Sequence, residues 1–98
     1  MFEAGIGESG EVFFAGRLDA AQAAKAESFL AGLDAPAVID FERLEYISSA
    51  GLGVLLKTQK RLMGAGGGLT LVNVNHHIRD VFRYSGFDQI FKIEPAAP

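Results

Sequence analysis

Two adjacent serines, Ser48 and Ser49, precede a pair of glycines in the stretch ISSAGLG, where an apolar run gives way to a helical pattern. A serine hydroxyl can cap a helix by accepting a hydrogen bond from a free amide of its first turn. It can also carry a phosphate, because the unpaired amides and the positive dipole end of a helix N-terminus stabilise negative charge. Because Gly51 and Gly53 have no side chains, a partner's active site could approach the hydroxyl closely. One serine suffices for a cap, so the residues alone leave two readings of the second serine, a structural one and a phosphoacceptor.

Other chemical motifs fit this chain poorly. Residues 5–10, GIGESG, have the letters of a dinucleotide-binding loop, but a β-prone run follows them instead of a helix, which favours a hairpin turn. Residues 64–68, GAGGG, lack the Lys-Ser/Thr of a P-loop and fit a helix-to-strand connection. His76 and His77 are adjacent and point in different directions, unlike the i, i+4 pair of a helical metal site. We therefore expect no metal and no cofactor.

Length and composition predict one small domain. The chain has 98 residues, and its 49% of hydrophobic residues can form one compact core across a single domain spanning residues 1–98. It has no cysteine, no basic leader and no apolar stretch near the roughly 20 residues of a membrane helix. A net charge of -3 is too small to indicate a nucleic-acid partner. We expect a cytoplasmic protein that binds neither nucleic acid nor membrane.

The charges are unevenly distributed along the chain. Residues 1–49 hold nine acids and three bases, giving -6, whereas residues 50–98 hold three acids and six bases, giving +3. Three of the acids, Asp40, Glu42 and Glu45, come shortly before the serines. A phosphate on the second serine would therefore enter an already negative neighbourhood and repel an acidic partner.

The spacing of apolar residues predicts alternating strands and helices. In chain order the predicted elements are a hairpin of residues 2–6 and 12–15, a helix over 19–33, a strand over 37–41, a helix over 49–63, a strand over 69–74, a helix over 76–85 and a strand over 90–93. Asp19 and Asn75 are expected to cap helices at their N-termini, and Gly86 to close the last helix. One sheet with helices packed against it, an α/β domain, is the natural architecture.

The helix predicted from Ser49 onward is amphipathic. Its apolar face is expected to hold Leu52, Leu55, Leu56 and Met63. Its other faces hold Lys57, Lys60 and Arg61. These bases either steer an acidic partner or are ordinary solvated charges, and the sequence leaves both readings open.

The stretch LEYISSAGLGVLL, residues 44–56, resembles the signature of the STAS domain of bacterial anti-sigma factor antagonists. In that family a strand similar to AVIDF leads into [Tyr/Phe]-[Ile/Met]-[Asp/Ser]-Ser-x-Gly-Leu, and the serine two places before the glycine, here Ser49, is phosphorylated. GRLDA, residues 16–20, is similar to the family's Gly-x-Leu-Asp start of the first helix, and YSGFDQIFKI matches near the end. One departure is Ser48, where many antagonists have aspartate. The resemblance implies a mixed β-sheet with its helices packed on one side.

The function that this resemblance implies is a switch and not catalysis. The unphosphorylated domain would sequester an anti-sigma factor that is also a serine kinase, and so release a sigma factor. Phosphorylation of Ser49 would weaken this binding, a serine phosphatase would reset it, and ATP and magnesium would belong to the kinase. The implied phosphosite neighbourhood and partner-binding surface comprises Asp19, Ser48, Gly51, Leu52 and Gly53.

Two alternatives remain open. The same fold serves as an accessory subunit of lipid-transport ABC systems and in stress-signalling assemblies, where the switch serine is absent or differently used; Ser49 favours the antagonist over these roles. The alternative from the enzyme class is a small serine esterase. It is disfavoured because a nucleophile elbow needs glycine at position 47, where this chain has Ile47, and because no convincing base accompanies the serine.

Overall fold

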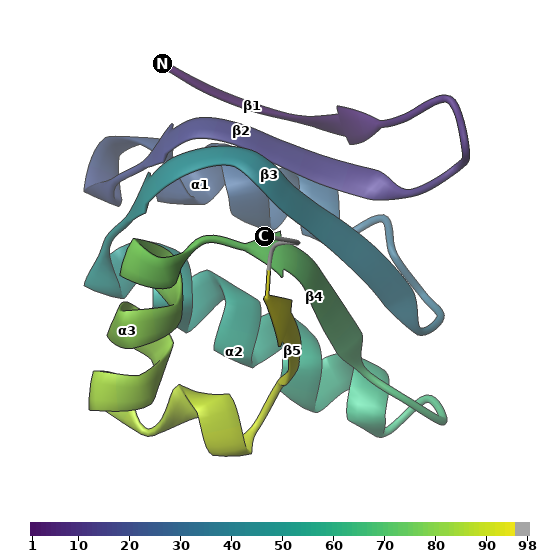
Figure 1. Cartoon of the computed structure of the whole chain (residues 1–98). Helices are drawn as coiled ribbons and strands as arrows, with labels where there is room; N and C mark the ends of the chain where they lie inside the picture. The colour runs from purple at the N-terminus through teal and green to yellow at the C-terminus, as the bar shows by residue number, and fades with distance from the viewer. Residues whose placement is uncertain (96–98) are drawn as a thin grey trace.

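The computed structural model describes residues 1–95 and contains one five-stranded sheet. Two short 3-10 helices, η1 and η2, accompany three α-helices. The elements in chain order are β1 (Phe2–Ile6), β2 (Val12–Leu18), η1 (Ala20–Gln22), α1 (Ala23–Leu30), β3 (Ala37–Ile47), α2 (Ser49–Met63), β4 (Leu69–Val74), α3 (His76–Ser85), η2 (Phe87–Gln89) and β5 (Lys92–Pro95) (Figure 1). The predicted order of strands and α-helices is confirmed.

The sheet is mixed, with its strands in the order β1-β2-β3-β4-β5. β1 runs antiparallel to β2, and the other neighbouring pairs are parallel. Buried side chains of all three α-helices join those of the strands in a single hydrophobic cluster, so the helices cover one face and leave the other open. The predicted α/β class, with helices on one side of a mixed sheet, is confirmed.

A chain of phenylalanine rings runs through the core from one edge of the sheet to the other. Phe2 meets Phe14 edge to face with ring centroids 5.3 Å apart, and Phe14 stacks on Phe41 at 5.8 Å. Phe41 contacts Phe82 of α3 at 6.4 Å, and Phe82 meets Phe91 at 5.6 Å. Such pairs contribute stabilisation beyond their buried area, so these rings tie the hairpin to the last part of the domain.

The first strand is joined to the sheet at a glycine in β2. Gly16 has a φ of 85°, a left-handed conformation that side chains disfavour, and a Cβ there would collide with the Met1 carbonyl oxygen. That carbonyl accepts a hydrogen bond from the Arg17 amide at 2.7 Å. The glycine of the GRLDA motif is therefore required by backbone geometry.

Two strands are longer than the sequence predicts. β2 continues to Leu18 instead of Ala15, and β3 continues to Ile47 instead of residue 41. The parallel pairing of these strands extends to their ends, where Leu18 lies opposite Ile47. The backbone bonds of this pairing outweigh the low strand propensity of the charged segment FERLE, whose charged side chains are exposed.

Two predictions about helices need correction. The helix predicted over residues 19–33 is a 3-10 turn followed by α1, which ends at Leu30 just before Gly32. Met63 of α2 is 60% exposed, and Leu62 is fully buried in its place. Leu62 lies seven residues after Leu55, and this spacing keeps the two leucines on one helical face.

The predicted connections and caps are confirmed. Residues 7–10 form the hairpin turn and residues 64–68 connect α2 to β4. The Asn75 side chain accepts a hydrogen bond from the Ile78 amide at 2.9 Å, and Gly86 ends α3 with a φ of 80°. Between residues 1 and 95, no helix has the length and apolar character needed to cross a membrane.

Candidate functional site

The serines and Asp19 come together because β2 and β3 end side by side. Leu18 is the register partner of Ile47, and the Ser48 amide donates a hydrogen bond of 2.9 Å to the Leu18 carbonyl. Asp19 follows directly after β2, and Ser48 follows directly after β3. The candidate site therefore lies at the carboxyl ends of two parallel strands, where loops of α/β sheets commonly bind their ligands.

Ser48 is the N-cap of α2. Its backbone is extended, with φ -92° and ψ 171°, and its hydroxyl oxygen accepts a hydrogen bond from the Gly51 amide at 3.2 Å. This bond satisfies one of the amides that a helix N-terminus leaves unpaired. The predicted capping role of the serine pair falls to Ser48.

Ser49 is the first residue of α2 and is exposed. Within residues 1–95, its hydroxyl has no hydrogen-bond partner, whereas the Ser48 hydroxyl is held by its cap bond. The amides of the first helical turn and the positive end of the helix dipole lie beside it, and no acidic residue occupies that turn. Ser49 is thus the more accessible of the two hydroxyls.

Asp19 caps the short η1 helix and not α1 itself. Its carboxylate oxygen accepts a hydrogen bond from the Gln22 amide at 3.2 Å, and its side chain is half-buried. The prediction that Asp19 serves as an N-cap is confirmed at this turn. Its position next to Leu18 also places a carboxylate near the start of α2.

The glycine pair divides into one buried and one open position. A Cβ at Gly51 would lie 2.8 Å from Leu18 Cγ and 3.0 Å from Ile47 Cγ1, so only glycine lets α2 approach the strand ends this closely. Leu52 is 6% exposed and packs in the core. Gly53 has nothing within 4 Å of its potential Cβ and is exposed. Gly51 and Leu52 hold the helix start in place, and their predicted part in partner binding stays a prediction.

One of the three acids expected near the phosphosite, Asp40, lies far from it along β3. Asp40 lies opposite Phe13 in the middle of the sheet, and its carboxylate accepts a hydrogen bond of 3.0 Å from the Asn73 side chain. At about 3.3 Å per strand residue, Asp40 and Ser49 are roughly 20 Å or more apart, beyond the screening length of about 8 Å. Asp40 therefore lies outside the expected negative neighbourhood, and the predicted contributions of Glu42 and Glu45 stay predictions.

The basic residues of α2 differ in the contacts that their side chains make. Lys57 pairs with Glu27 of α1 at 2.5 Å. Arg61 donates to the carbonyl oxygens of Leu33 at 2.6 Å and Leu30 at 2.9 Å, which caps the C-terminal end of α1. These two side chains connect α1 to α2, so Lys60 is the member of the group that best fits a steering role.

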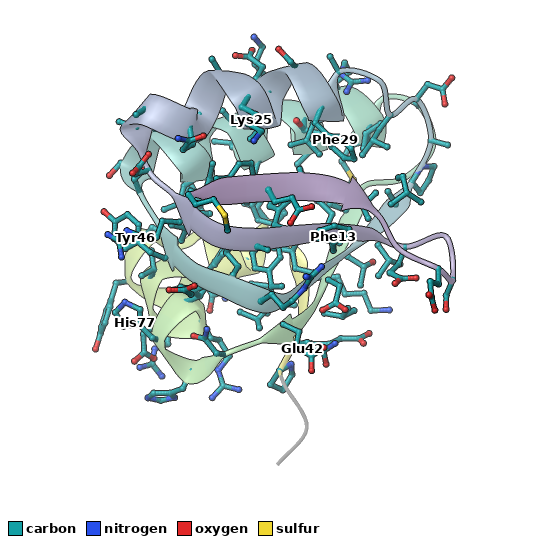
Figure 2. All side chains as sticks on the ribbon, turned by 90° about the horizontal axis from the view of Figure 1, so that it is seen from above. Phe13, Lys25, Phe29, Glu42, Tyr46 and His77 are labelled. Carbon is teal, nitrogen blue, oxygen red and sulfur yellow. The ribbon has the colours of Figure 1, made fainter. Side chains whose placement is uncertain are left out.

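An aromatic and cationic pair beside the site was not predicted. The guanidinium of Arg17 lies 4.4 Å from the ring centroid of Tyr46, which is its register partner on β3. Figure 2 shows Tyr46 at the end of the sheet. The alternation in LEYI is the sequence signal for this position, but the predicted strand ends at residue 41. Tyrosine and arginine are the side chains enriched at the energetic centres of protein interfaces.

The histidines lie outside this site. The His76 imidazole is 3.3 Å from the Asp80 carboxylate one turn further along α3. Across residues 1–95, no group of three or more His, Cys, Asp or Glu side chains could hold a metal ion.

The comparison with protein families identifies the domain. A sequence model of the family described as "Mlab, STAS domain" matches residues 3–94, and the chain therefore belongs to the STAS domain family. BtrV of Bordetella bronchiseptica, which is named as an anti-sigma factor antagonist, is 48% identical over 56 residues, which are 57% of this chain and 48% of BtrV. A STAS-domain containing protein of Pseudomonas aeruginosa is 32% identical over 56 residues, 57% of this chain and 55% of that protein. The chain thus spans about half the length of the curated relatives it matches.

Solved structures share the fold at lower sequence identity. An anti-sigma factor antagonist from Mycobacterium paratuberculosis superposes with a TM-score of 0.84 at 23% identity, covering 97% of this chain and 86% of that chain. SpoIIAA of Bacillus in its phosphorylated form superposes with a TM-score of 0.66 at 22% identity, covering 95% and 90%. These structures confirm that the mixed sheet with three helices is the STAS fold.

Proposed function

We propose that this chain is an anti-sigma factor antagonist that is switched by phosphorylation of Ser49. The observation that carries the proposal is the division between the serines: the Ser48 hydroxyl accepts the cap bond, and the Ser49 hydroxyl is exposed at the helix start. The similarity to BtrV and membership of the STAS family support the same function. The protein acts by binding and not by catalysis.

The partner in this proposal is an anti-sigma factor that is also a serine kinase. The Ser49 oxygen attacks the γ-phosphorus of ATP held by the kinase, the bond to the bridging oxygen of ADP breaks, and the hydroxyl proton passes to a base of the kinase. A serine phosphatase reverses the modification with water and releases inorganic phosphate. ATP and magnesium belong to the kinase, so the antagonist itself holds no cofactor.

The phosphate acts on the surface and leaves the fold intact. It adds a charge of about -1.5 to -2 at the first position of α2, where the helix dipole tolerates a negative group. Asp19 and Glu45 add negative charge nearby, so a partner face that accepts the neutral hydroxyl must now meet a strongly anionic surface. Binding to the anti-sigma factor therefore weakens after phosphorylation. The switch operates in the cytoplasm, where sigma factors act.

Direct contacts in the complex involve the exposed part of the site. Gly53 leaves open space beside the serine, and Arg17 with Tyr46 offers a rigid aromatic and cationic surface at the same end of the sheet. Gly51 and Leu52 contribute indirectly, because their packing fixes where α2 begins.

A second candidate follows from the family description, which names Mlab beside the STAS domain. In this reading the chain is an accessory subunit of a lipid-transport ABC system, and the start of α2 docks against that system without phosphorylation. The two candidates differ in whether a phosphate on Ser49 controls binding.

Affinity capture with the parent chain, followed by titration calorimetry with the captured partner, tests the proposal. The antagonist reading predicts capture of a protein with serine kinase activity, strong binding to the parent and Ser49→Ala chains, and weaker binding to Ser49→Asp. The matched control is Ser9→Asp, the same substitution in the exposed turn before β2, at the opposite end of that strand from the site. Capture of a transport subunit with equal affinity for all variants would contradict the antagonist function and favour the second candidate.

A further inference from the structure

The two edges of the sheet are protected to different degrees. β5 is short and carries Lys92 and Pro95, two features that discourage pairing with a further strand. β1 forms the other edge, and within residues 1–95 it pairs with β2 on one side only. Its sequence, FEAGI, contains neither lysine nor proline. An unprotected edge of this kind is a template for strand addition.

The register of the hairpin defines which backbone groups of β1 face outward. Met1 and Gly7 bond to β2, through Arg17 and Glu11 respectively. Backbone groups alternate in direction along a strand, so the N–H and C=O groups of Phe2, Ala4 and Ile6 point away from the sheet.

One of these outward groups is occupied by a side chain from α1. The Lys25 ammonium donates a hydrogen bond of 2.8 Å to the Phe2 carbonyl, although the two residues are 23 positions apart. In Figure 2 Lys25 lies on α1 above the β1 edge. Lys25 places a positive charge on this edge, where β1 itself carries only the acidic Glu3.

We propose that β1 is a strand-pairing surface for a second copy of this chain, and that Lys25 blocks this pairing by covering the Phe2 carbonyl. The inference concerns a different element from the phosphosite and does not depend on the function proposed above. Removal of the lysine charge opens the edge, and two copies then join their sheets through antiparallel β1 strands.

The strand is complementary to itself in this arrangement. With the two-fold axis at Ala4, the two Ala4 residues exchange backbone bonds, and Phe2 of each copy pairs with Ile6 of the other. Ile6 is 59% exposed in the single chain, so the pairing buries an apolar side chain that the fold leaves in water. The only charged side chain of β1, Glu3, lies opposite Gly5 of the other copy, and no like charge faces it directly.

Sedimentation of Lys25→Met beside the parent chain and a Lys25→Arg control tests the proposal. Methionine keeps the apolar stem of lysine and loses the charge and the donor, whereas arginine keeps both. We expect the parent and Lys25→Arg to sediment as monomers. Lys25→Met should dimerise with a Kd at least about tenfold lower than that of the parent, because pairing no longer has to displace the Lys25 ammonium from the Phe2 carbonyl.

Two further measurements locate the interface. The amides of Ala4 and Ile6 should exchange with solvent quickly in the parent and slowly in the Lys25→Met dimer. The double variant Lys25→Met/Ile6→Lys, which replaces an exposed side chain and restores a charge at the edge, should return to a monomer. A Lys25→Met chain that stays monomeric, a parent that dimerises equally well, or a dimer with unprotected Ala4 and Ile6 amides would each overturn the proposal.

Discussion

Replacing each glycine near the start of α2 by alanine should change stability in opposite directions. A Cβ at Gly51 would lie 2.8 Å from Leu18 Cγ and 3.0 Å from Ile47 Cγ1, so the helix or both side chains must move. Overpacking of this kind costs about 1–3 kcal/mol, against a gain in helix propensity of about 0.5–1 kcal/mol. We expect Gly51→Ala to lower the free energy of unfolding by about 1–2 kcal/mol.

Gly53→Ala is the matched control in the same helix. Nothing lies within 4 Å of its potential Cβ, so alanine there adds helix propensity without a clash. We expect the free energy of unfolding to rise by about 0.5–1 kcal/mol. Urea unfolding of both variants, followed by circular dichroism, measures the difference. If Gly51→Ala stabilises the domain as much as Gly53→Ala does, close packing is not what holds the start of α2 against the strand ends.

Three further predictions concern buried and capping groups. Gln59→Leu should lower the free energy of unfolding by about 2–4 kcal/mol in urea unfolding, because the buried amide bonds the Ile90 carbonyl and the Leu69 N–H, which leucine leaves unpaired. A loss below about 1 kcal/mol would contradict this reasoning. Asp19→Asn should keep the stability of the cap while changing the rate of phosphorylation by the partner kinase, and an unchanged rate would limit Asp19 to capping. Arg61→Ala should lower the free energy of unfolding by about 1–2 kcal/mol in the same assay, because it removes the donor that bonds the carbonyls at the end of α1. Lys60→Ala should change the free energy of unfolding by no more than about 0.5 kcal/mol, and equal effects of the two variants would refute the bridging role of Arg61.

The sequence predicts local features of the fold well. The caps at Ser48 and Asn75, the glycine at the end of α3 and the order of elements all depend on residues close together in the chain. The ends of β2 and β3 were missed because the segment after Phe41 is highly charged. Its strand conformation comes from pairing with residues about 30 positions earlier, which local propensity does not encode.

The candidate site is predictable in its residue types and not in its packing. The sequence identifies the two serines and Asp19. The structure brings Asp19 close to Ser48 because the Ser48 amide donates a hydrogen bond to the carbonyl of Leu18, the residue directly before Asp19. The reason for Gly51 is its approach to Leu18, a contact between residues 33 positions apart in the chain. The sequence also misjudges the distance between Asp40 and the serines. A short separation along the chain becomes a long distance when the strand is extended, and the predicted strand ends at residue 41.

Mapping of the phosphate tests the central claim most directly. The parent chain, Ser48→Ala and Ser49→Ala would each be incubated with the captured partner kinase and ATP, and their tryptic peptides analysed by mass spectrometry. We predict phosphate on Ser49 in the parent and in Ser48→Ala, with a cap loss of about 1 kcal/mol in the latter, and none in Ser49→Ala. Phosphate on Ser48 in the parent, or phosphate that persists in Ser49→Ala, would contradict the assignment of Ser49 as the switch.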